Sequence, residues 1–306
     1  MEETMRENVC DNDKVIQIKN LCKSYDGFVM KNMNLDVTQG CIHGFIGQNG
    51  AGKTTTIKAV LNMIECSEGE IRVFGLDHIR SECEIKEQIG VVFDEMGFHE
   101  YMTPVQIDKM MAGVYKNWES DTFYQFLEQF GLPKKRACGK FSRGMRMKLQ
   151  IAVALSHRAK LLIMDEPTSG LDPVVRNEIL DIFQEFIEKE DHSVFLSSHI
   201  ISDLERIADE ITFLDKGKVL LSGNKDDMLL SHGMIKCSKE QAEQIQKEDI
   251  IFLQKSTYGC EILVSDRQLC TAKYEGLLIE PVTLEQIMLF YIQRENSAMR
   301  GEREAL

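Results

Sequence analysis

The stretch that decides the fold is "GFIGQNGAGKTTTIKAVL", residues 44–61. An apolar run comes first, and Gly47, Gly50 and Gly52 follow before Lys53 and three threonines lead into a helical pattern. Residues 47–54 match G-x-x-x-x-G-K-[ST], with a strand expected before the match and a helix after it. Glycines let successive backbone N–H groups form an anion-binding nest, and the helix start adds its positive dipole end. We therefore predict a loop that holds a nucleoside triphosphate.

Individual residues of this loop have expected roles. Lys53 should reach the β- and γ-phosphates, and the Thr54 hydroxyl should bind Mg²⁺. An ordinary glycine-rich turn is the alternative, but a chance match with the correct flanks is rare. The predicted nucleotide-binding residues of the loop are Gly47, Gln48, Asn49, Gly50, Ala51, Gly52, Lys53, Thr54 and Thr55.

A second candidate element is "LLIMDE", residues 161–166. Four apolar residues predict a buried strand, and Asp165 and Glu166 stand at its carboxyl end, where open α/β sheets place their ligands. We expect Asp165 to reach Mg²⁺, directly or through water, and Glu166 to act as general base on the attacking water. An acidic pair at a strand end is by itself more often a solvated turn or a helix cap. Its combination with the loop at 47–54 favours the metal-binding and catalytic roles.

The order of the elements predicts an α/β fold. Strands that are apolar throughout alternate with helical segments, which is typical of a buried, largely parallel sheet. Strands are expected within 15–46 and at 70–75, 89–93, 161–165, 193–199 and 210–223. Helices are expected at 53–64, 173–190 and 200–208, together with a helical region at 104–154 that is broken at "GLPKK" (131–135) and "KFSRG" (140–144). We therefore predict a P-loop NTPase core with antiparallel N-terminal strands and a helical subdomain at about 95–155.

The character of the sequence changes after about Gly223. A polar helical stretch surrounds "SKEQAEQIQKED" (238–249), and strand-like runs follow at "IIFLQ" (250–254) and "CEILVS" (260–265). An apolar helix is expected at "TLEQIMLFYIQ" (283–293), and residues 296–306 are expected to be frayed. We therefore predict two domains, residues 14–222 and a small α+β appendage at 223–306.

Composition and charge exclude several classes. The 306-residue chain carries a net charge of −13, so it lacks the basic field that attracts nucleic-acid phosphates, and nucleic acid is not an expected partner. Its N-terminus lacks a secretory signal, and no apolar run approaches the roughly 18 residues of a membrane-spanning helix. The nine cysteines are scattered, odd in number and without a C-x-x-C pair, which favours reduced thiols over disulfides. We therefore expect a cytoplasmic protein.

The segment "KFSRGMRMKLQIAVALSHRAKLLIMDEPTSGLDP", residues 140–173, is more specific than a nucleotide-binding pattern. With the loop at 47–54, it resembles the ATP-binding subunits of ABC transporters, and the resemblance covers about residues 15–222. Ser142 and Gly144 match the Ser and the second Gly of the family's L-S-G-G-Q signature, whereas Phe141, Arg143 and Met145 depart from it. The resemblance implies that Ser142 and Gly144 cap the ATP bound by an opposite subunit.

Further elements of the family follow in the expected order. "SGLD", residues 169–172, matches the loop that joins the sites of two subunits. His199 matches the switch histidine that contacts the γ-phosphate, which implies a catalytic role, although a lone His after a strand is usually structural. Tyr25, in "KSYDGF", matches the aromatic residue that stacks on adenine, with a packing role as the alternative.

One departure from the family concerns the metal site. The family commonly has Gln at the end of a strand that reads roughly I-G-Y-V-P-Q, where it ligates Mg²⁺ and senses the membrane subunit. Here the strand reads "IGVVFDEMG" and places Asp94 at that position. An aspartate can ligate Mg²⁺, but it is one methylene shorter and charged. The resemblance therefore implies Asp94 as a metal ligand, with a solvated loop residue as the alternative.

The combination of motifs looks most like bacterial ABC subunits that serve ABC-2 type membrane subunits, several of which export peptides or antibiotics. With one loop and one signature per chain, the resemblance implies a head-to-tail dimer, formed with an identical or a different ATP-binding subunit, on the inner face of the membrane. The helical insert, about residues 95–140, would then dock on membrane-spanning partners. A soluble regulatory ATPase is the alternative function.

Overall fold

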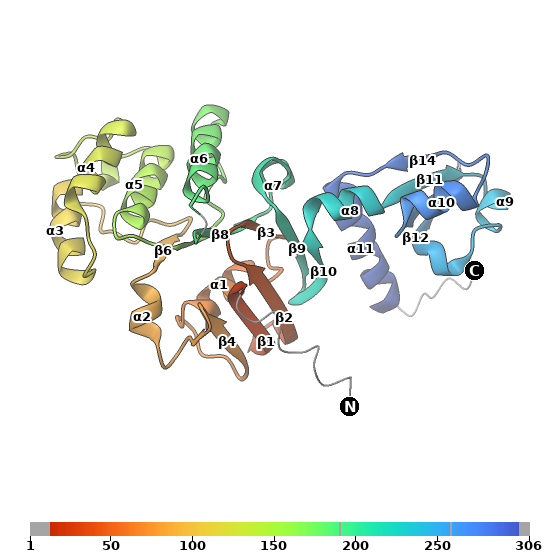
Figure 1. The fold of residues 1–306 in the computed structure, drawn as a ribbon, viewed down its shortest axis with the longest axis horizontal. Coiled ribbons are helices and arrows are strands. Elements are labelled where there is room, and N and C mark those ends of the chain that lie inside the picture. Colours follow the sequence, from red (N-terminus) through yellow and green to blue (C-terminus); the bar gives the residue numbers. More distant parts are fainter. Residues whose placement is uncertain (1–12, 190, 258, 300–306) are drawn as a thin grey trace. The chain divides into compact units, whose positions relative to one another are not determined.

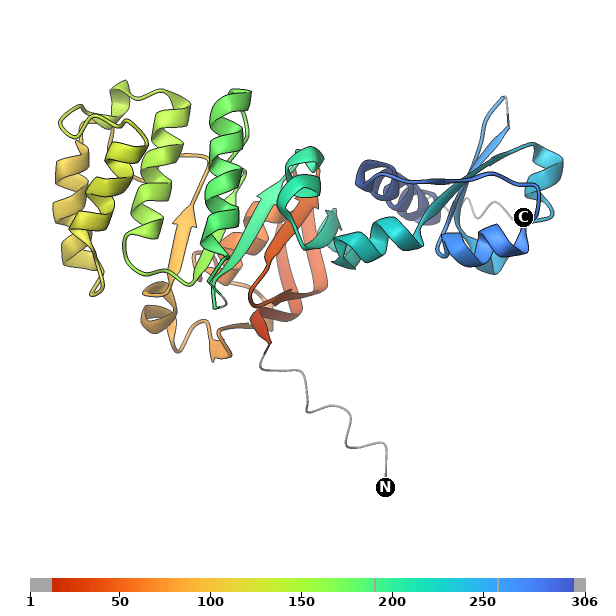
Figure 2. The ribbon, with the colours of Figure 1, turned by 45° about the horizontal axis from the view of Figure 1, so that its top comes forward.

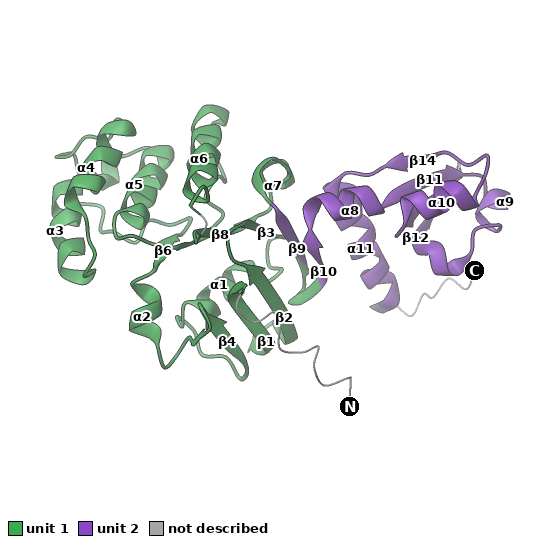
Figure 3. Ribbon diagram, in the orientation of Figure 1, with its two compact units in different colours: residues 1–208, 214–219 green, residues 209–213, 220–306 purple. Residues whose placement is uncertain are grey.

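The computed structural model describes residues 13–299 except 190 and 258 (Figure 1). The chain divides into two compact units (Figure 3). The first unit comprises residues 1–208 and 214–219, and the second unit comprises residues 209–213 and 220–306. The hairpin of β9 (Glu210–Asp215) and β10 (Lys218–Asn224) is divided between them.

An antiparallel sheet opens the first unit. Its order is β2-β1-β4-β5, formed by β1 (Lys14–Tyr25), β2 (Phe28–Thr38), β4 (Glu68–Val73) and β5 (Leu76–Asp77). Two residues, Asp26 and Gly27, join β1 to β2, and Gly27 has a φ of 79°. A tight hairpin turn of this kind favours Asp-Gly because the turn needs positive φ.

A parallel set of strands lies at the centre of the first unit. The neighbours run in the order β3-β8-β7-β6, formed by β3 (Ile42–Gly47), β8 (Ser193–Ser198), β7 (Leu161–Asp165) and β6 (Ile89–Val92). Every residue of β3, β7 and β8 is buried, which explains their continuous apolar sequences. Because the strands are parallel, their carboxyl ends meet at one edge, where ligands of such sheets bind.

Helices complete the first unit. They are α1 (Lys53–Val60), α2 (Glu82–Lys86), α3 (Pro104–Val114), α4 (Ser120–Gln129), α5 (Arg143–Leu155), α6 (Pro173–Phe186) and α7 (Ile201–Ile207), with a 3₁₀ turn at Cys138–Lys140. Their starts follow the sequence, because Thr103, Ser142 and Asp172 accept hydrogen bonds from the first turns of α3, α5 and α6. Proline occupies the first position of α3 and α6, where it costs no hydrogen bond.

The helices α3, α4 and α5 form a subdomain with its own core. Figure 2 shows them side by side in yellow and green. Buried residues of this core include Ile107, Phe123, Leu127 and Leu149. Beside it, the carboxylate of Asp108 accepts hydrogen bonds from Trp118 Nε1 (2.9 Å), Ser120 Oγ (2.6 Å) and Tyr124 Oη (3.1 Å), which ties α3 to α4.

The second unit contains an antiparallel sheet of order β12-β13-β11-β14. The strands are β11 (Gly233–Cys237), β12 (Ile250–Lys255), β13 (Cys260–Val264) and β14 (Ile279–Pro281). The helices are α8 (Lys225–Ser231), α9 (Lys239–Ala242), α10 (Arg267–Lys273) and α11 (Leu284–Met299), with a 3₁₀ turn at Lys247–Asp249. Apolar residues of the sheet and of α9 and α10 pack into a core of this unit.

The predicted fold class is confirmed, with corrections to individual elements. Helix α11 continues to Met299, so the expectation of fraying from residue 296 is wrong for residues 296–299, and residues 300–306 lie outside the described chain. Helix α6 ends at Phe186 instead of 190, and Ile187 is its C-cap. The polar stretch at 238–249 forms α9 and a 3₁₀ turn in place of one helix.

Two further observations concern thiols and membrane spans. The eight cysteines within the described residues are free thiols, and Cys10 lies outside them. Among residues 13–299, apart from 190 and 258, no helix has the length and hydrophobicity needed to cross a membrane.

We predict that the stability of the first unit depends on pH through His157. Its ring is buried and stacks on Tyr115 (centroids 3.9 Å apart), and burial lowers the pKa of His157 to about 4, against a smaller opposing effect of Glu87. The unfolded chain takes up a proton near pH 6.5, so the free energy of unfolding should fall as pH drops below that value. Between pH 7.5 and 5 the loss should be about 2 kcal/mol.

Urea unfolding at both pH values, followed by Trp118 fluorescence, measures this effect. His157→Phe keeps a ring against Tyr115 and removes the titrating group, so it should reduce the pH dependence. An unchanged pH dependence in this variant would contradict the assignment.

Candidate functional site

The loop between β3 and α1 depends on glycine at two close approaches. Gly52, the N-cap of α1, has a φ of 113°, and a Cβ there would lie 2.8 Å from the Phe28 ring. A Cβ on Gly47 would lie 2.6 Å from Leu214 O. These close approaches explain why glycine suits positions 47 and 52 of the loop.

A cavity of about 390 Å³ opens on this loop. It includes Tyr25, which is 44% exposed, and the Phe28 ring, whose centroid lies 6.4 Å from that of Tyr25. The lining residues are Tyr25, Phe28, Gln48, Asn49, Gly50, Gly52, Lys53, Thr54, Thr55 and Glu166. Most predicted residues of the loop therefore line one cavity together with one of the two predicted acidic residues.

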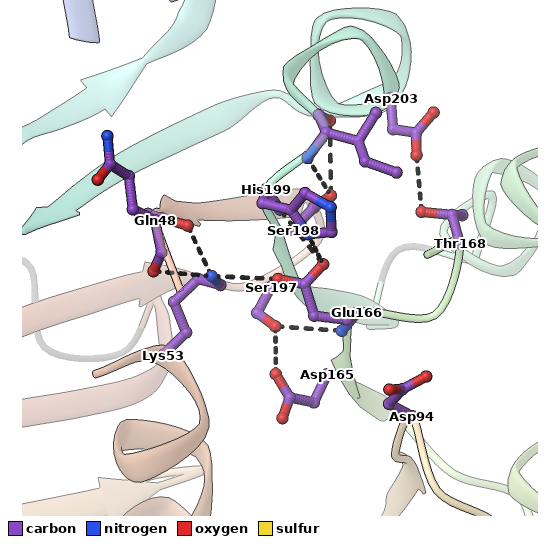
Figure 4. A network of polar contacts seen from close by, with 12 residues as sticks. Gln48, Lys53, Asp94, Asp165, Glu166, Thr168, Ser197, Ser198, His199 and Asp203 are labelled. Atoms are coloured by element: carbon purple, nitrogen blue, oxygen red, sulfur yellow. Dashed lines mark hydrogen bonds and ion pairs between the residues drawn. The ribbon is translucent and has the colours of Figure 1, made fainter. Parts of the chain in front are cut away.

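Lys53 connects the loop to the acidic pair (Figure 4). Lys53 is 5% exposed, and its ammonium donates to Gly47 O (2.6 Å) and Gln48 O (3.4 Å). The same ammonium lies 3.1 Å from Glu166 Oε1. The ammonium therefore contacts oxygen atoms of the loop and of the residue that follows β7.

Asp165 binds two hydroxyl groups. Thr54 Oγ1 donates to Asp165 Oδ2 (2.6 Å), and Ser197 Oγ donates to Asp165 Oδ1 (2.5 Å). The N–H group of Glu166 also donates to Ser197, at 3.1 Å to the carbonyl oxygen and 3.2 Å to Oγ. Ser197 on β8 thus holds both acidic residues in place.

Glu166 has a backbone conformation that is uncommon outside glycine. Its φ of 54° lies in the left-handed region. Residues other than glycine that adopt this conformation cluster at functional sites. One carboxylate oxygen, Oε1, contacts Lys53, and the other, Oε2, lies 2.5 Å from His199 Nδ1 and accepts from the His199 N–H group (3.3 Å). Figure 4 shows the carboxylate of Glu166 between these two residues.

The signature residues lie elsewhere in the same chain. Ser142 is the exposed N-cap of α5, and its Oγ accepts from the Met145 N–H group (3.2 Å). Gly144 faces α6, where a Cβ would lie 3.2 Å from Val175 Cγ1. Neither Ser142 nor Gly144 lines the cavity of their own chain.

Asp94 also lies apart from the cluster around Asp165 (Figure 4). Its carboxylate forms an ion pair with Arg143. Within the described residues no group of three or more His, Cys, Asp or Glu side chains is arranged to hold a metal ion. Thr54 and Asp165 could therefore supply only part of a Mg²⁺ shell, as is usual where substrate phosphates supply the rest.

Two residues of the site were not predicted from the sequence. Ser197 lies in "SVFLSS", where two serines that end an apolar strand were a usable signal for a polar edge. Phe28 lines the cavity beside Tyr25, but a Phe near a hairpin turn gives no signal of its own. Both act through contacts between segments far apart in the chain.

A glycine loop between a buried parallel strand and a helix, a buried lysine within it, and an acidic pair on a neighbouring strand define a P-loop nucleotide-binding protein. A family model described as ABC transporter matches residues 30–169. The bacitracin transport ATP-binding protein BcrA of Bacillus licheniformis is 37% identical over 67% of this chain and 68% of that protein. The lantibiotic transport ATP-binding protein SrtF of Streptococcus pyogenes is 34% identical over 69% of this chain and 92% of that protein. A solved ATP-binding subunit of an ABC transporter shares the fold, with a TM-score of 0.64 and 27% identity over 70% of this chain and 91% of that chain.

The chain therefore belongs to the ABC transporter family, as one of its ATP-binding proteins. It binds ATP and hydrolyses it to energise a membrane transporter. The resemblance derived from the sequence is confirmed, and nothing in these comparisons favours the soluble regulatory ATPase.

Lys53→Ala should abolish ATP binding, because it removes the buried ammonium and leaves Glu166 as an uncompensated negative charge in the cavity. Calorimetric titration with ATP measures the loss. Lys58→Ala, in the same helix but outside the cavity lining, is the matched control and should bind as the wild type does. Unchanged affinity in folded Lys53→Ala would place the phosphates elsewhere.

Proposed function

We propose that the cavity holds ATP with Mg²⁺ and that Glu166 is the general base of hydrolysis. The observation that carries the proposal is the position of the Glu166 carboxylate, between Lys53 (3.1 Å) and His199 (2.5 Å) at the end of β7. A carboxylate fixed there can accept a proton from water next to the γ-phosphate, with His199 as its neighbour on the other side. Lys53 binds the phosphates in this proposal, and the backbone N–H groups of residues 47–55 surround them.

The donor set of the cavity fits Mg²⁺. Thr54 and Asp165 already lie within hydrogen-bond distance of each other, and hydroxyl and carboxylate oxygens are ligands that Mg²⁺ accepts. A bound Mg²⁺ would neutralise negative charge on the phosphates. Asp94, a candidate ligand from its place in the sequence, pairs with Arg143 in this structure and is left out of the proposed Mg²⁺ shell. Tyr25 is the candidate for stacking on adenine, and Phe28 extends the aromatic wall of the cavity.

Two chains form the working unit in this proposal. Ser142 is exposed at the N-terminus of a 13-residue helix, and it does not line the cavity of its own chain. A helix N-terminus suits an anion, and the Ser142 hydroxyl, whose oxygen accepts from Met145, still has its own proton to donate. A head-to-tail dimer, with an identical or a different second subunit, would bring Ser142 and Gly144 of each chain to the nucleotide of the other.

The proposed cargo is a peptide or an antibiotic, exported through membrane subunits of the ABC-2 type. The names of two relatives state transport of bacitracin and of a lantibiotic. The chain would then lie on the cytoplasmic face of the membrane, attached through these subunits. The helical insert supports a docking role because it exposes Tyr101 (75%), Val114 (61%) and Met110 (38%).

Glu166→Gln should bind ATP and fail to cleave it. The amide keeps the size of the side chain but cannot accept a proton, and loss of a general base typically costs about 10²- to 10⁴-fold in rate. ATP should then hold two chains together, and light scattering at high protein concentration should show an ATP-dependent dimer. Adding Ser142→Arg should reverse the dimer, because the larger side chain blocks the opposite nucleotide.

The outcomes separate two parts of the proposal. Hydrolysis at the wild-type rate in Glu166→Gln would contradict the assignment of Glu166 as the general base. Loss of hydrolysis with a dimer that persists in the double variant would instead remove the head-to-tail arrangement.

Tyr101→Asp should weaken membrane association several-fold, because it places a charge on the proposed apolar docking surface. The measurement is recovery of the tagged chain with membranes of its native host. Ile79→Asp is the matched control, since Ile79 is also exposed (62%) but lies outside the helical insert. If Tyr101→Asp and Ile79→Asp are recovered with membranes to the same extent, the helical insert is not the docking surface.

A further inference from the structure

Arg143, the first residue of α5, reaches two other segments of the first unit. Its Nη2 atom forms an ion pair with Asp94 Oδ1, two residues after β6. Its guanidinium also lies against Gly170, where an added Cβ would be 2.6 Å from Nη1 and 3.0 Å from Cζ. The φ of Gly170 is 65°, a backbone conformation that favours glycine. Because Gly170 has no Cβ, the guanidinium can lie directly against its backbone. One side chain thus joins the start of α5, the Asp94 segment and the loop at 169–172.

A second contact attaches the same helix to the same segment. Gln150 is 7% exposed, and its Nε2 donates to Phe93 O (3.1 Å). Residues 143 and 150 are seven positions apart, which is two helical turns, so their side chains leave one face of α5. Gln150 holds the middle of the helix to Phe93, while Arg143 holds its beginning to Asp94. The two contacts therefore join α5 to residues 93–94 at its beginning and at its middle.

The ion pair itself does little for stability. The side chains of Arg143 and Asp94 are 48% and 51% exposed, and ion pairs at such exposure contribute little to folding. What a planar guanidinium supplies is direction, because its donors form a rigid fork that suits a carboxylate and can lie flat on a backbone. The effect of this contact should therefore appear in the geometry of the signature and not in the unfolding equilibrium.

Both members of the pair stand where this chain departs from the family pattern. Asp94 occupies the position of the common Gln, and Arg143 is the residue that interrupts the signature between Ser142 and Gly144. In the structure the two departures are linked, because the side chains of Asp94 and Arg143 form an ion pair.

We propose that Arg143 is a positioning residue for ATP hydrolysis. Paired with Asp94 and seated on Gly170, it sets the direction in which Ser142 meets the nucleotide of a second subunit. Asp94 acts as the partner of Arg143 in this role, and it is not required as a metal ligand. The inference rests on the proposed head-to-tail arrangement.

A double-mutant cycle on the full chain tests the proposal. Arg143→Ala should lower kcat about 10- to 100-fold, the range expected when a helix end in an active site is misplaced. ATP affinity of the isolated chain and the thermal unfolding midpoint should not change. Asp94→Ala should show a similar loss, and adding Arg143→Ala to it should cause little further loss. Arg146→Ala, one turn along α5, is the matched control and should keep the wild-type kcat, since Arg146 contacts Gly139 O instead.

One further variant separates charge from geometry, and one further measurement separates pairing from metal binding. Arg143→Lys keeps the charge without the planar fork, so it should recover part of the lost kcat. The Mg²⁺ concentration for half-maximal hydrolysis should be the same in Asp94→Ala as in the wild type.

Losses that multiply in the double variant, or a raised Mg²⁺ requirement in Asp94→Ala, would overturn the proposal and favour Asp94 as a metal ligand. These outcomes leave the ATPase assignment standing if Glu166→Gln still abolishes hydrolysis. Wild-type hydrolysis in Glu166→Gln would remove the proposed base and leave the cycle at Arg143 and Asp94 as a separate result.

Discussion

The buried ammonium of Lys53 is the constraint around which the site is built. A cation with 5% exposure needs oxygen partners, since a buried unpaired charge is strongly destabilising. Its partners are two carbonyl groups of its own loop and the carboxylate of Glu166, so it ties the end of β3 to the end of β7. Asp165 accepts a hydrogen bond from the Thr54 hydroxyl, and Ser197 on β8 forms hydrogen bonds with both Asp165 and Glu166. This convergence is possible because the three strands are parallel and end at one edge.

The sequence predicts those parts of the site that are local in the chain. The loop at 47–54 and the pair Asp165–Glu166 are each recognisable from a few neighbouring residues, and the parallel topology brings them together. Ser197, Phe28 and the pairing of Asp94 with Arg143 depend on contacts between distant segments, which a single sequence does not reveal. The second unit was harder to predict, because α8 and α10 have seven residues each and β14 has three, too few to show a periodic pattern.

The proposed arrangement divides each site between two chains. A chain supplies Lys53 and Glu166 to one site and Ser142 to the other. A defect at Ser142 would therefore impair hydrolysis at the site of the second chain and leave the site of its own chain intact. In a mixed dimer, one chain damaged at Lys53 and one at Ser142 would place both defects in the same site and leave the other complete.

Three of the apolar clusters within the described part of the chain differ in the elements that build them. One lies among the strands and α1, one within α3–α5, and one in the second unit. The third cluster belongs to a different compact unit from the first two, so we expect the two units to unfold in separate steps, which a single melting temperature would not describe. Trp118 is the only tryptophan in the chain and packs against the second cluster. Its fluorescence therefore reports the unfolding of the first unit and does not report that of the second.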